Sequence, residues 1–207
     1  MRLRALPAAL LMILAVPGCS AISSLNSASQ PLEIYEISTP AIQPAATRRN
    51  IELIVEEPSA SGALATERIM IRPAPLQAQY LPGVRWSDPA PVMLQTQMLR
   101  GLSATGALGS VGRRPVGTSG DYAVLSELTD FQAESTGDGD DVTIRVRLMV
   151  RLVREQDAQV IATRTFEVTE AAASSDPGPI VEAFDRAAGR LLGDVMPWVL
   201  RNSGAAS

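Results

Sequence analysis

The chain has 207 residues, with 18 basic and 22 acidic side chains and a formal net charge of −4. Every basic residue is an arginine, and the sequence contains no histidine. A mildly acidic chain disfavours nucleic-acid binding, which needs a basic face. Histidine is the commonest general base and a frequent metal ligand, so its absence disfavours an enzyme or a metal site. We therefore expect a non-catalytic protein without a cofactor, a metal site or a nucleic-acid partner.

The first eighteen residues are typical of a signal peptide. Residues 1–4 form a short basic start, and residues 6–16 form an uncharged apolar run. As a helix this run is about 16 Å long, too short to cross a hydrocarbon core of about 30 Å. Small residues then precede the single cysteine of the chain, in Val16-Pro17-Gly18-Cys19. This motif resembles the lipobox of bacterial lipoproteins.

The lipobox resemblance implies a lipid anchor. It implies that the sulfur of Cys19 receives a diacylglyceryl group, that the chain is cleaved before Cys19, and that the new amino terminus is acylated. Stable anchoring needs more than one acyl chain, which this modification provides. In the sorting rule of bacterial lipoproteins, aspartate after the cysteine favours the inner membrane, so Ser20 favours the outer membrane. We expect a periplasm-facing protein attached to the cell envelope by its lipid.

We divide the chain into four parts. Residues 1–18 are the signal peptide, residues 19–31 a flexible tether, residues 32–203 a single α+β domain, and residues 204–207 a frayed tail. The tether is rich in small polar residues, and twelve such residues have an r.m.s. span of about 20 Å. From Cys19 on, 16 arginines face 22 acidic residues, a net charge of −6.

Six segments of the domain are predicted to be strands, most of them because apolar and polar residues alternate. The clearest is VTIRVRLMVRLV, with six apolar residues on one face and three arginines on the other. Polar turns join the last three segments, which indicates an antiparallel meander, and the first of these three has an irregular pattern that suggests a bulge. The predicted strands are Leu32–Ser38, Ile51–Glu57, Glu67–Arg72, Tyr122–Gln132, Val142–Val153 and Val160–Thr169.

Two segments have the apolar periodicity of helices. The first begins at Asp88-Pro89 and the second at Asp176-Pro177, because aspartate can cap a helix and proline suits the first helical position. We expect the first helix to end at Gly106 and Pro197 to end or kink the second. The two apolar stripes consist of Leu94, Met98 and Leu102, and of Ile180, Phe184, Ala187, Ala188, Leu191, Leu192 and Val195.

The expected fold is an α+β two-layer sandwich of order βββαβββα. Each helix has one apolar stripe and the clearest strand has one apolar face. The economical arrangement is a largely antiparallel sheet with both helices on one face.

Two groups of residues are candidates for partner binding. Arg145, Arg147 and Arg151 share one strand face and could bind lipid phosphates or an acidic partner. The alternative is a solvated sheet face in which Glu127, Glu134 or Glu167 lies across the strands.

The second group is Tyr80, Arg85 and Trp86, in a segment expected to be a loop. Trp, Tyr and Arg concentrate at interface hot spots, so these residues could anchor a partner. A buried aromatic residue that closes the end of the sandwich is the alternative.

Several segments resemble one known family. They are RIMIRPAPLQAQYLPGVRWSDPAPVMLQTQMLRGL, GDYAVLSELTDFQAES, RVRLMVRLVRE and AFDRAAGRLLGDVMPWVL, and the most specific part is RWSDPAP before a helix. They are similar to the auxiliary lipoproteins of ABC-type transport systems, a group that includes the lipoprotein of the paraquat-inducible operon. The resemblance implies no catalysis. It implies partners, namely a permease, an ATPase and a substrate-binding MCE-domain protein, which together move lipids or other hydrophobic compounds between the membranes.

Three hypotheses of function remain open at this point. The chain could be a lipid-tethered transport adaptor that docks on the MCE-domain protein. It could instead carry a lipid itself, which requires an apolar cavity of a few hundred cubic ångströms. It could also be a structural envelope lipoprotein without a transport role.

Overall fold

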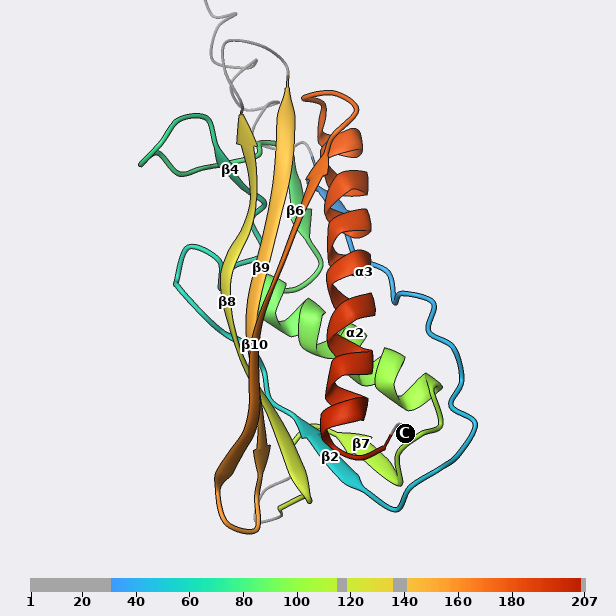
Figure 1. The fold of residues 1–207 in the computed structure, drawn as a ribbon. Coiled ribbons are helices and arrows are strands. Elements are labelled where there is room, and N and C mark those ends of the chain that lie inside the picture. Colours follow the sequence, from blue (N-terminus) through green and yellow to red (C-terminus); the bar gives the residue numbers. More distant parts are fainter. Residues whose placement is uncertain (1–30, 115–118, 136–140, 206–207) are drawn as a thin grey trace, which may run out of the picture. The chain divides into compact units, whose positions relative to one another are not determined.

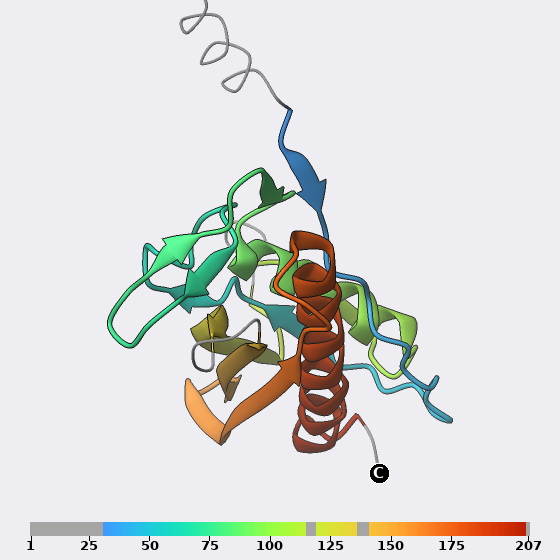
Figure 2. The ribbon, with the colours of Figure 1, turned by 90° about the horizontal axis from the view of Figure 1, so that it is seen from above.

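The computed structural model describes residues 31–114, 119–135 and 141–205. The predicted signal peptide, Cys19 and the tether up to residue 30 lie outside these residues. From Leu32 on, the described residues belong to one compact unit. This unit is an α+β fold with a multi-stranded sheet and two helices (Figure 1, and from above in Figure 2).

Three long strands form an antiparallel meander, as predicted. They are β8 (Tyr122–Ser135), β9 (Val142–Arg154) and β10 (Gln159–Ala171). The apolar residues of β9 from Ile144 to Leu152 are buried at every second position, which confirms the predicted inward face. The pairing of β8 with β9 shifts between Leu128 and Asp130, so the irregular pattern of β8 corresponds to a β-bulge.

The strands of the first half of the chain run along the other edge of β8. β2 (Glu52–Val55), β3 (Ser59–Ala60) and β4 (Met70–Arg72) pair with successive parts of β8, each in parallel. β7 (Ser110–Gly112) pairs in parallel with the far side of β2. The sheet is therefore partly parallel, which corrects the expected antiparallel arrangement for this half of the chain.

Four short strands that were not predicted change the expected element order. They are β3, β7, β5 (Gln79–Tyr80), which forms a hairpin with β4, and β6 (Val84–Trp86). β6 pairs in parallel with β1 (Glu33–Tyr35), which lies within the predicted first strand, and these two form a separate sheet. Six strands precede the first helix and four follow it, so βββαβββα is not the observed order. The predicted segments contain β1, β2 and β4. The sequence did not predict β3, β5, β6 and β7, because these short strands lie outside any longer alternating segment.

Helix α2 (Ala90–Ala104) buries its predicted stripe, with Leu94, Met98 and Leu102 at most 1% exposed. Its start differs from the prediction, because Pro89 is the N-cap and no side chain caps the helix. Two buried glutamines fix its position. The amide of Gln95 donates to the carbonyl of Val55 at 2.9 Å, and that of Gln97 donates to the carbonyl of Ile37 at 2.7 Å.

Helix α3 (Pro177–Asn202) buries every residue of its predicted stripe. Asp176 is the N-cap, but its side chain forms no capping hydrogen bond. The helix continues through Pro197 for five more residues instead of ending there. Trp198, Val199 and Leu200 are buried in this last part, and packing of this kind can offset the backbone hydrogen bond that proline lacks. Packing reaches Ala205, inside the stretch expected to fray.

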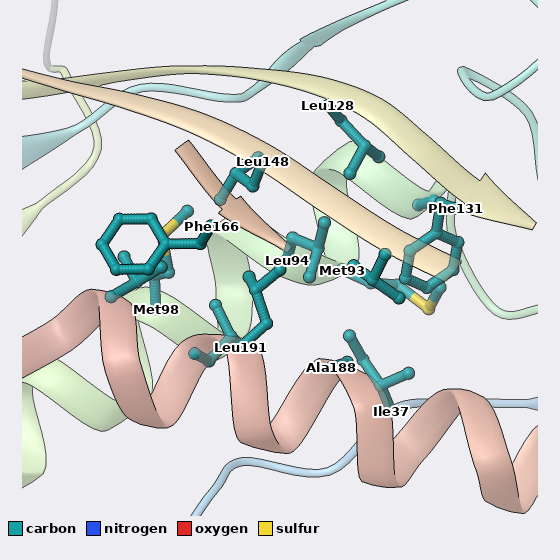
Figure 3. Packing of buried hydrophobic residues seen from close by; sticks show 14 of the residues in the cluster. Ile37, Met93, Leu94, Met98, Leu128, Phe131, Leu148, Phe166, Ala188 and Leu191 are labelled. Carbon is teal, nitrogen blue, oxygen red and sulfur yellow. The ribbon is translucent and has the colours of Figure 1, made fainter. Parts of the chain in front are cut away.

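Side chains from both helices and from the meander meet in one hydrophobic core. Figure 3 shows Leu94 and Met98 of α2, Leu191 of α3 and Leu148 of β9 converging in it. An aromatic group extends this core, since the ring of Trp86 lies 5.7 Å from Phe131 and 5.3 Å from Phe184 between centroids.

The unit has two ends that are useful landmarks (Figure 1). At the upper end, β4 and β8 finish near Arg72 and Ser135, and α3 begins at Pro177. At the lower end, β8 begins, β9 turns into β10, and α3 finishes.

Candidate partner-binding surfaces

The solvent-facing side of the meander, called the outer face here, carries the three arginines singled out from the sequence. Because side chains alternate along a strand, these arginines lie opposite the buried face of β9. Acidic residues of β8 and β10 lie across from them. The outer face consists of Leu125, Glu127, Asp130, Glu134, Arg145, Arg147, Met149, Arg151 and Glu167.

Arg145 is held by two carboxylates of the protein itself. Its Nε lies 3.1 Å from Glu134 Oε1 on β8, and its Nη1 lies 2.6 Å from Glu167 Oε1 on β10. Burial alone would raise the pKa of Glu134, but hydrogen bonds from Arg145 and Gln132 outweigh this and lower it. The expected cross-strand carboxylates are therefore present for Arg145, which acts as a cross-strand clamp.

The other two arginines have weaker ion pairing or none with the described residues. Arg147 Nε lies 3.8 Å from Glu167 Oε2, a loose ion pair at an exposed position. Arg151 forms no ion pair with any described residue, and its guanidinium contacts the sulfur of Met149 at 3.7 Å. It lies beside the exposed Leu125, at a pocket of about 270 Å³ that Glu56, Glu57 and Glu127 also line.

The group Tyr80, Arg85 and Trp86 lies mostly on short strands rather than in a loop. Trp86 is 1% exposed and belongs to the core, which corresponds to the packing alternative. Arg85 donates to Glu67 at 2.6 Å, so its charge is paired within the protein. Half-buried Tyr80 has the guanidinium of Arg68 3.9 Å above its ring. These residues therefore stabilise the region between β4 and β6.

An exposed apolar loop between β4 and β5 was not singled out from the sequence. Leu76 at its tip is fully exposed and has a positive φ of 68°. The amide of Gln77 donates to the carbonyl of Ala74 at 3.1 Å, which closes a turn with Pro75 and Leu76 at its centre. Pro75 was the only signal for this turn, because proline favours its first central position. The second normally takes glycine or asparagine, so the sequence did not indicate it.

The pockets of the described residues are open and polar or small. One of about 690 Å³ lies at the lower end, where Asp121, Arg154 and Glu155 contribute to its lining. A more apolar one of about 170 Å³ lies at the upper end, between Ile71, Val142 and Ile180. Within residues 31–114, 119–135 and 141–205, no group of three or more potential metal-binding side chains comes together. None of the helices in these ranges is long and apolar enough to cross a membrane.

The chain is similar to proteins of several bacteria. It is 26% identical over 174 residues to an uncharacterised protein of Bradyrhizobium diazoefficiens, covering 80% of this chain but only 44% of that protein. The crystal structure of protein XCC0632 from Xanthomonas campestris superposes with a TM-score of 0.75 at 25% identity, covering 83% of this chain and 96% of that one. A second crystal structure, of an uncharacterised protein, has a TM-score of 0.62 at 16% identity and covers 82% of this chain and 99% of that one.

The family match covers the strands and helices from β1 into the second half of α3. The model of the family described as the ABC-type transport auxiliary lipoprotein component matches residues 35–196. This match includes the outer face, the β4–β5 loop and the whole of the meander. The description is of an auxiliary rather than a catalytic component, and it places the protein in the cell envelope. The chain belongs to the ABC-type transport auxiliary lipoprotein family.

Proposed function

We propose that this protein is a lipid-anchored, non-catalytic adaptor of an MCE-associated ABC transport system for lipids or other hydrophobic compounds. The observation that carries this proposal is the family match over residues 35–196. The lipobox supports an anchor at Cys19, and Ser20 supports attachment to the outer membrane. The partners in this proposal are an MCE-domain protein, a permease and an ATPase.

The part of the outer face around Arg151 is the docking surface that the geometry favours. Arg145 is neutralised by two carboxylates, whereas Arg151 forms no ion pair with a described residue. Exposed Leu125 and partly buried Met149 adjoin it, so apolar area and an unpaired arginine occur together. Arginine beside apolar surface is common at interface hot spots. We therefore assign the contact with the MCE-domain protein to this part of the outer face.

The alternative of a lipid carrier receives less support from the geometry. Binding pockets for small molecules usually measure about 300–1,000 Å³. The apolar pocket at the upper end holds about 170 Å³. Between the helices and the meander, the side chains pack in one continuous core.

Arg151→Glu tests the proposed docking surface. The matched control is Arg100→Glu, because Arg100 is an exposed residue of α2 that forms no ion pair with a described residue. We expect Arg151→Glu to weaken binding to the proposed MCE-domain partner by about tenfold or more, since reversing a charge at an interface is costly. The control should bind as tightly as the unchanged protein. Equal binding by both variants would exclude this part of the outer face, and no binding of any MCE-domain protein would overturn the proposed function.

A further inference from the structure

Exposed apolar side chains occur at two separate places toward the upper end of the unit, on β1 and in the β4–β5 loop. Leu32 and Ile34, on and beside β1, are 51% and 56% exposed, and Leu76 in the β4–β5 loop is fully exposed. β4 pairs with the last residues of β8, so the loop that follows it projects sideways from the upper part of the unit (Figure 1). β1 lies beside the first half of α3, because Ser38, shortly after it, donates two hydrogen bonds to Asp185.

The local backbone holds Leu76 away from the protein. Pro75 and Leu76 occupy the two central positions of the turn from Ala74 to Gln77, and Leu76 adopts a left-handed conformation. Leucine is unfavourable there, because its Cβ crowds the backbone in that conformation. All six residues from Pro73 to Ala78 are exposed and uncharged. The loop therefore presents a large apolar side chain to its surroundings at a local cost, as binding loops often do.

The chain enters the unit at this same end. Twelve residues, 20–31, separate Cys19 from Leu32, and a flexible segment of this length has an r.m.s. span of about 20 Å. Helix α3, with 26 residues, is about 39 Å long and reaches from the upper to the lower end. A lipid on Cys19 therefore keeps a bilayer within reach of the upper end, and the lower end lies about 39 Å from the upper end along α3.

We propose that the β4–β5 loop inserts Leu76 into the lipid leaflet that holds the Cys19 anchor, so that the domain is oriented by two membrane contacts. This inference rests on the lipid anchor of the proposed function. Arg72 is the last residue of β4 and adjoins the loop, and its charge is suited to lipid phosphates at the edge of the contact. The Nε of Arg72 is buried without a hydrogen-bond partner among the described residues.

The lipid surface accounts for these observations better than a protein partner does. The loop offers one apolar side chain on a narrow tip, which suits a fluid apolar phase more than a shaped pocket. The tether keeps a bilayer within a limited distance of this end, whereas a protein partner has no such link to it. Contact by the loop also leaves the Arg151 region of the outer face, nearer the lower end, open for docking.

The single cysteine allows a direct test with the chain from Cys19 on, which contains all the described residues. Its thiol is coupled to a maleimide-bearing lipid in vesicles of phosphatidylcholine and phosphatidylglycerol that contain brominated phosphatidylcholine. Leu76→Trp places a fluorophore on the loop. The matched control is Val160→Trp, an exposed apolar position at the lower end. The native Trp86 and Trp198 are buried, and their emission is subtracted with the unsubstituted chain.

We expect the emission of the Leu76→Trp variant to shift to shorter wavelength and to be quenched by bromine, while the Val160→Trp variant behaves as it does in solution. An unquenched, unshifted Leu76→Trp signal overturns the proposal and assigns the loop to solvent or to a protein partner. Equal quenching of both variants also overturns it, because the domain would then adsorb without orientation. The anchor is attached chemically here, so the result is independent of lipidation and transport in the cell.

Discussion

The three arginines of β9 share one face of the sheet but differ in their environment. Arg145 contacts carboxylates on both neighbouring strands, Arg147 contacts one of them loosely, and Arg151 contacts none among the described residues. The alternation of apolar and polar residues along β9 predicts that all three arginines lie on the same side. It does not predict their ion-pair partners, because these depend on the register of β8 and β10. Arg145 therefore links neighbouring strands, whereas Arg151 forms no ion pair with a described residue, although the sequence pattern treats them alike.

This division predicts different costs of removing the side chains. Arg145→Ala should lower the free energy of unfolding by about 1 kcal/mol, the upper range for a partly exposed ion pair. Arg151→Ala should change it by less than about 0.5 kcal/mol, as at other exposed positions without partners. Urea unfolding followed by circular dichroism measures both. A larger loss for Arg151→Ala than for Arg145→Ala would contradict the assignment.

Leu76 adopts a backbone conformation that is unfavourable for leucine. Leu76→Asn should raise the free energy of unfolding by about 0.5–1 kcal/mol, because asparagine tolerates the left-handed conformation better. Ala158, in the turn between β9 and β10, also has a positive φ, of 54°, and Ala158→Asn serves as the matched control for stability. Both variants should be stabilised in thermal unfolding, whereas only Leu76→Asn should weaken vesicle contact. A destabilised Leu76→Asn would show that the leucine side chain is needed for folding.

At the scale of elements, the long periodic segments were predictable and the short ones were not. In α2, α3 and the strands of the meander, an apolar pattern repeats over ten or more residues. A repeat of this length predicts both the type of element and the face that it buries. β3, β5, β6 and β7 have two or three residues, and they are strands because β8, β4, β1 and β2 lie next to them. Their backbone hydrogen bonds are a tertiary effect that no local pattern encodes.

Pro197 illustrates how packing overrides a local rule. Proline inside a helix lacks one backbone hydrogen bond and usually ends or kinks the helix. Here the helix continues, and the residues that follow are buried, including Trp198, whose ring lies 5.7 Å from that of Phe166 between centroids. The sequence shows the proline and the apolar residues after it, but the partner ring comes from β10. The candidate docking surface depends in the same way on contacts between distant strands.

The start of β8 is fixed by one charged contact that should be sensitive to pH. Glu155, 11% exposed, accepts a hydrogen bond from Arg114 and another from the Gly120 amide at 2.7 Å. The bond from Arg114 is the main reason why the pKa of Glu155 lies below its ordinary value. A carboxyl with a lowered folded-state pKa contributes stability above its unfolded pKa and loses it as the pH falls through the folded value.

Glu155→Gln should therefore lower the free energy of unfolding by about 1 kcal/mol at neutral pH, the scale of a charge-assisted hydrogen bond. The difference from the unchanged protein should shrink as the pH falls through the lowered pKa, because the native carboxylate is then protonated too. Glu182→Gln is the control, since Glu182 is exposed on α3 and forms no ion pair with a described residue. Urea unfolding at a series of pH values measures both, and a difference that grows toward acid would contradict this account.

At the scale of the whole molecule, the account describes a rigid domain that acts by contact from a lipid anchor. The domain has one continuous core, two chemically different surfaces and an entry point at its upper end. In the proposed arrangement the loop with Leu76 faces the leaflet that holds the anchor, and the outer face around Arg151 lies on the sheet nearer the other end. In this arrangement the lipid supplies both location and orientation, and the sheet supplies the partner contact.

The most direct test of this account removes only the anchor. A chain with Cys19→Ala, exported by an ordinary cleavable signal peptide, is placed in a strain that lacks the protein, and transfer of a labelled lipid between the two membranes is measured. This soluble form should unfold at the same urea concentration as the anchored one but fail to restore lipid transfer. Full restoration by the soluble form would contradict the account.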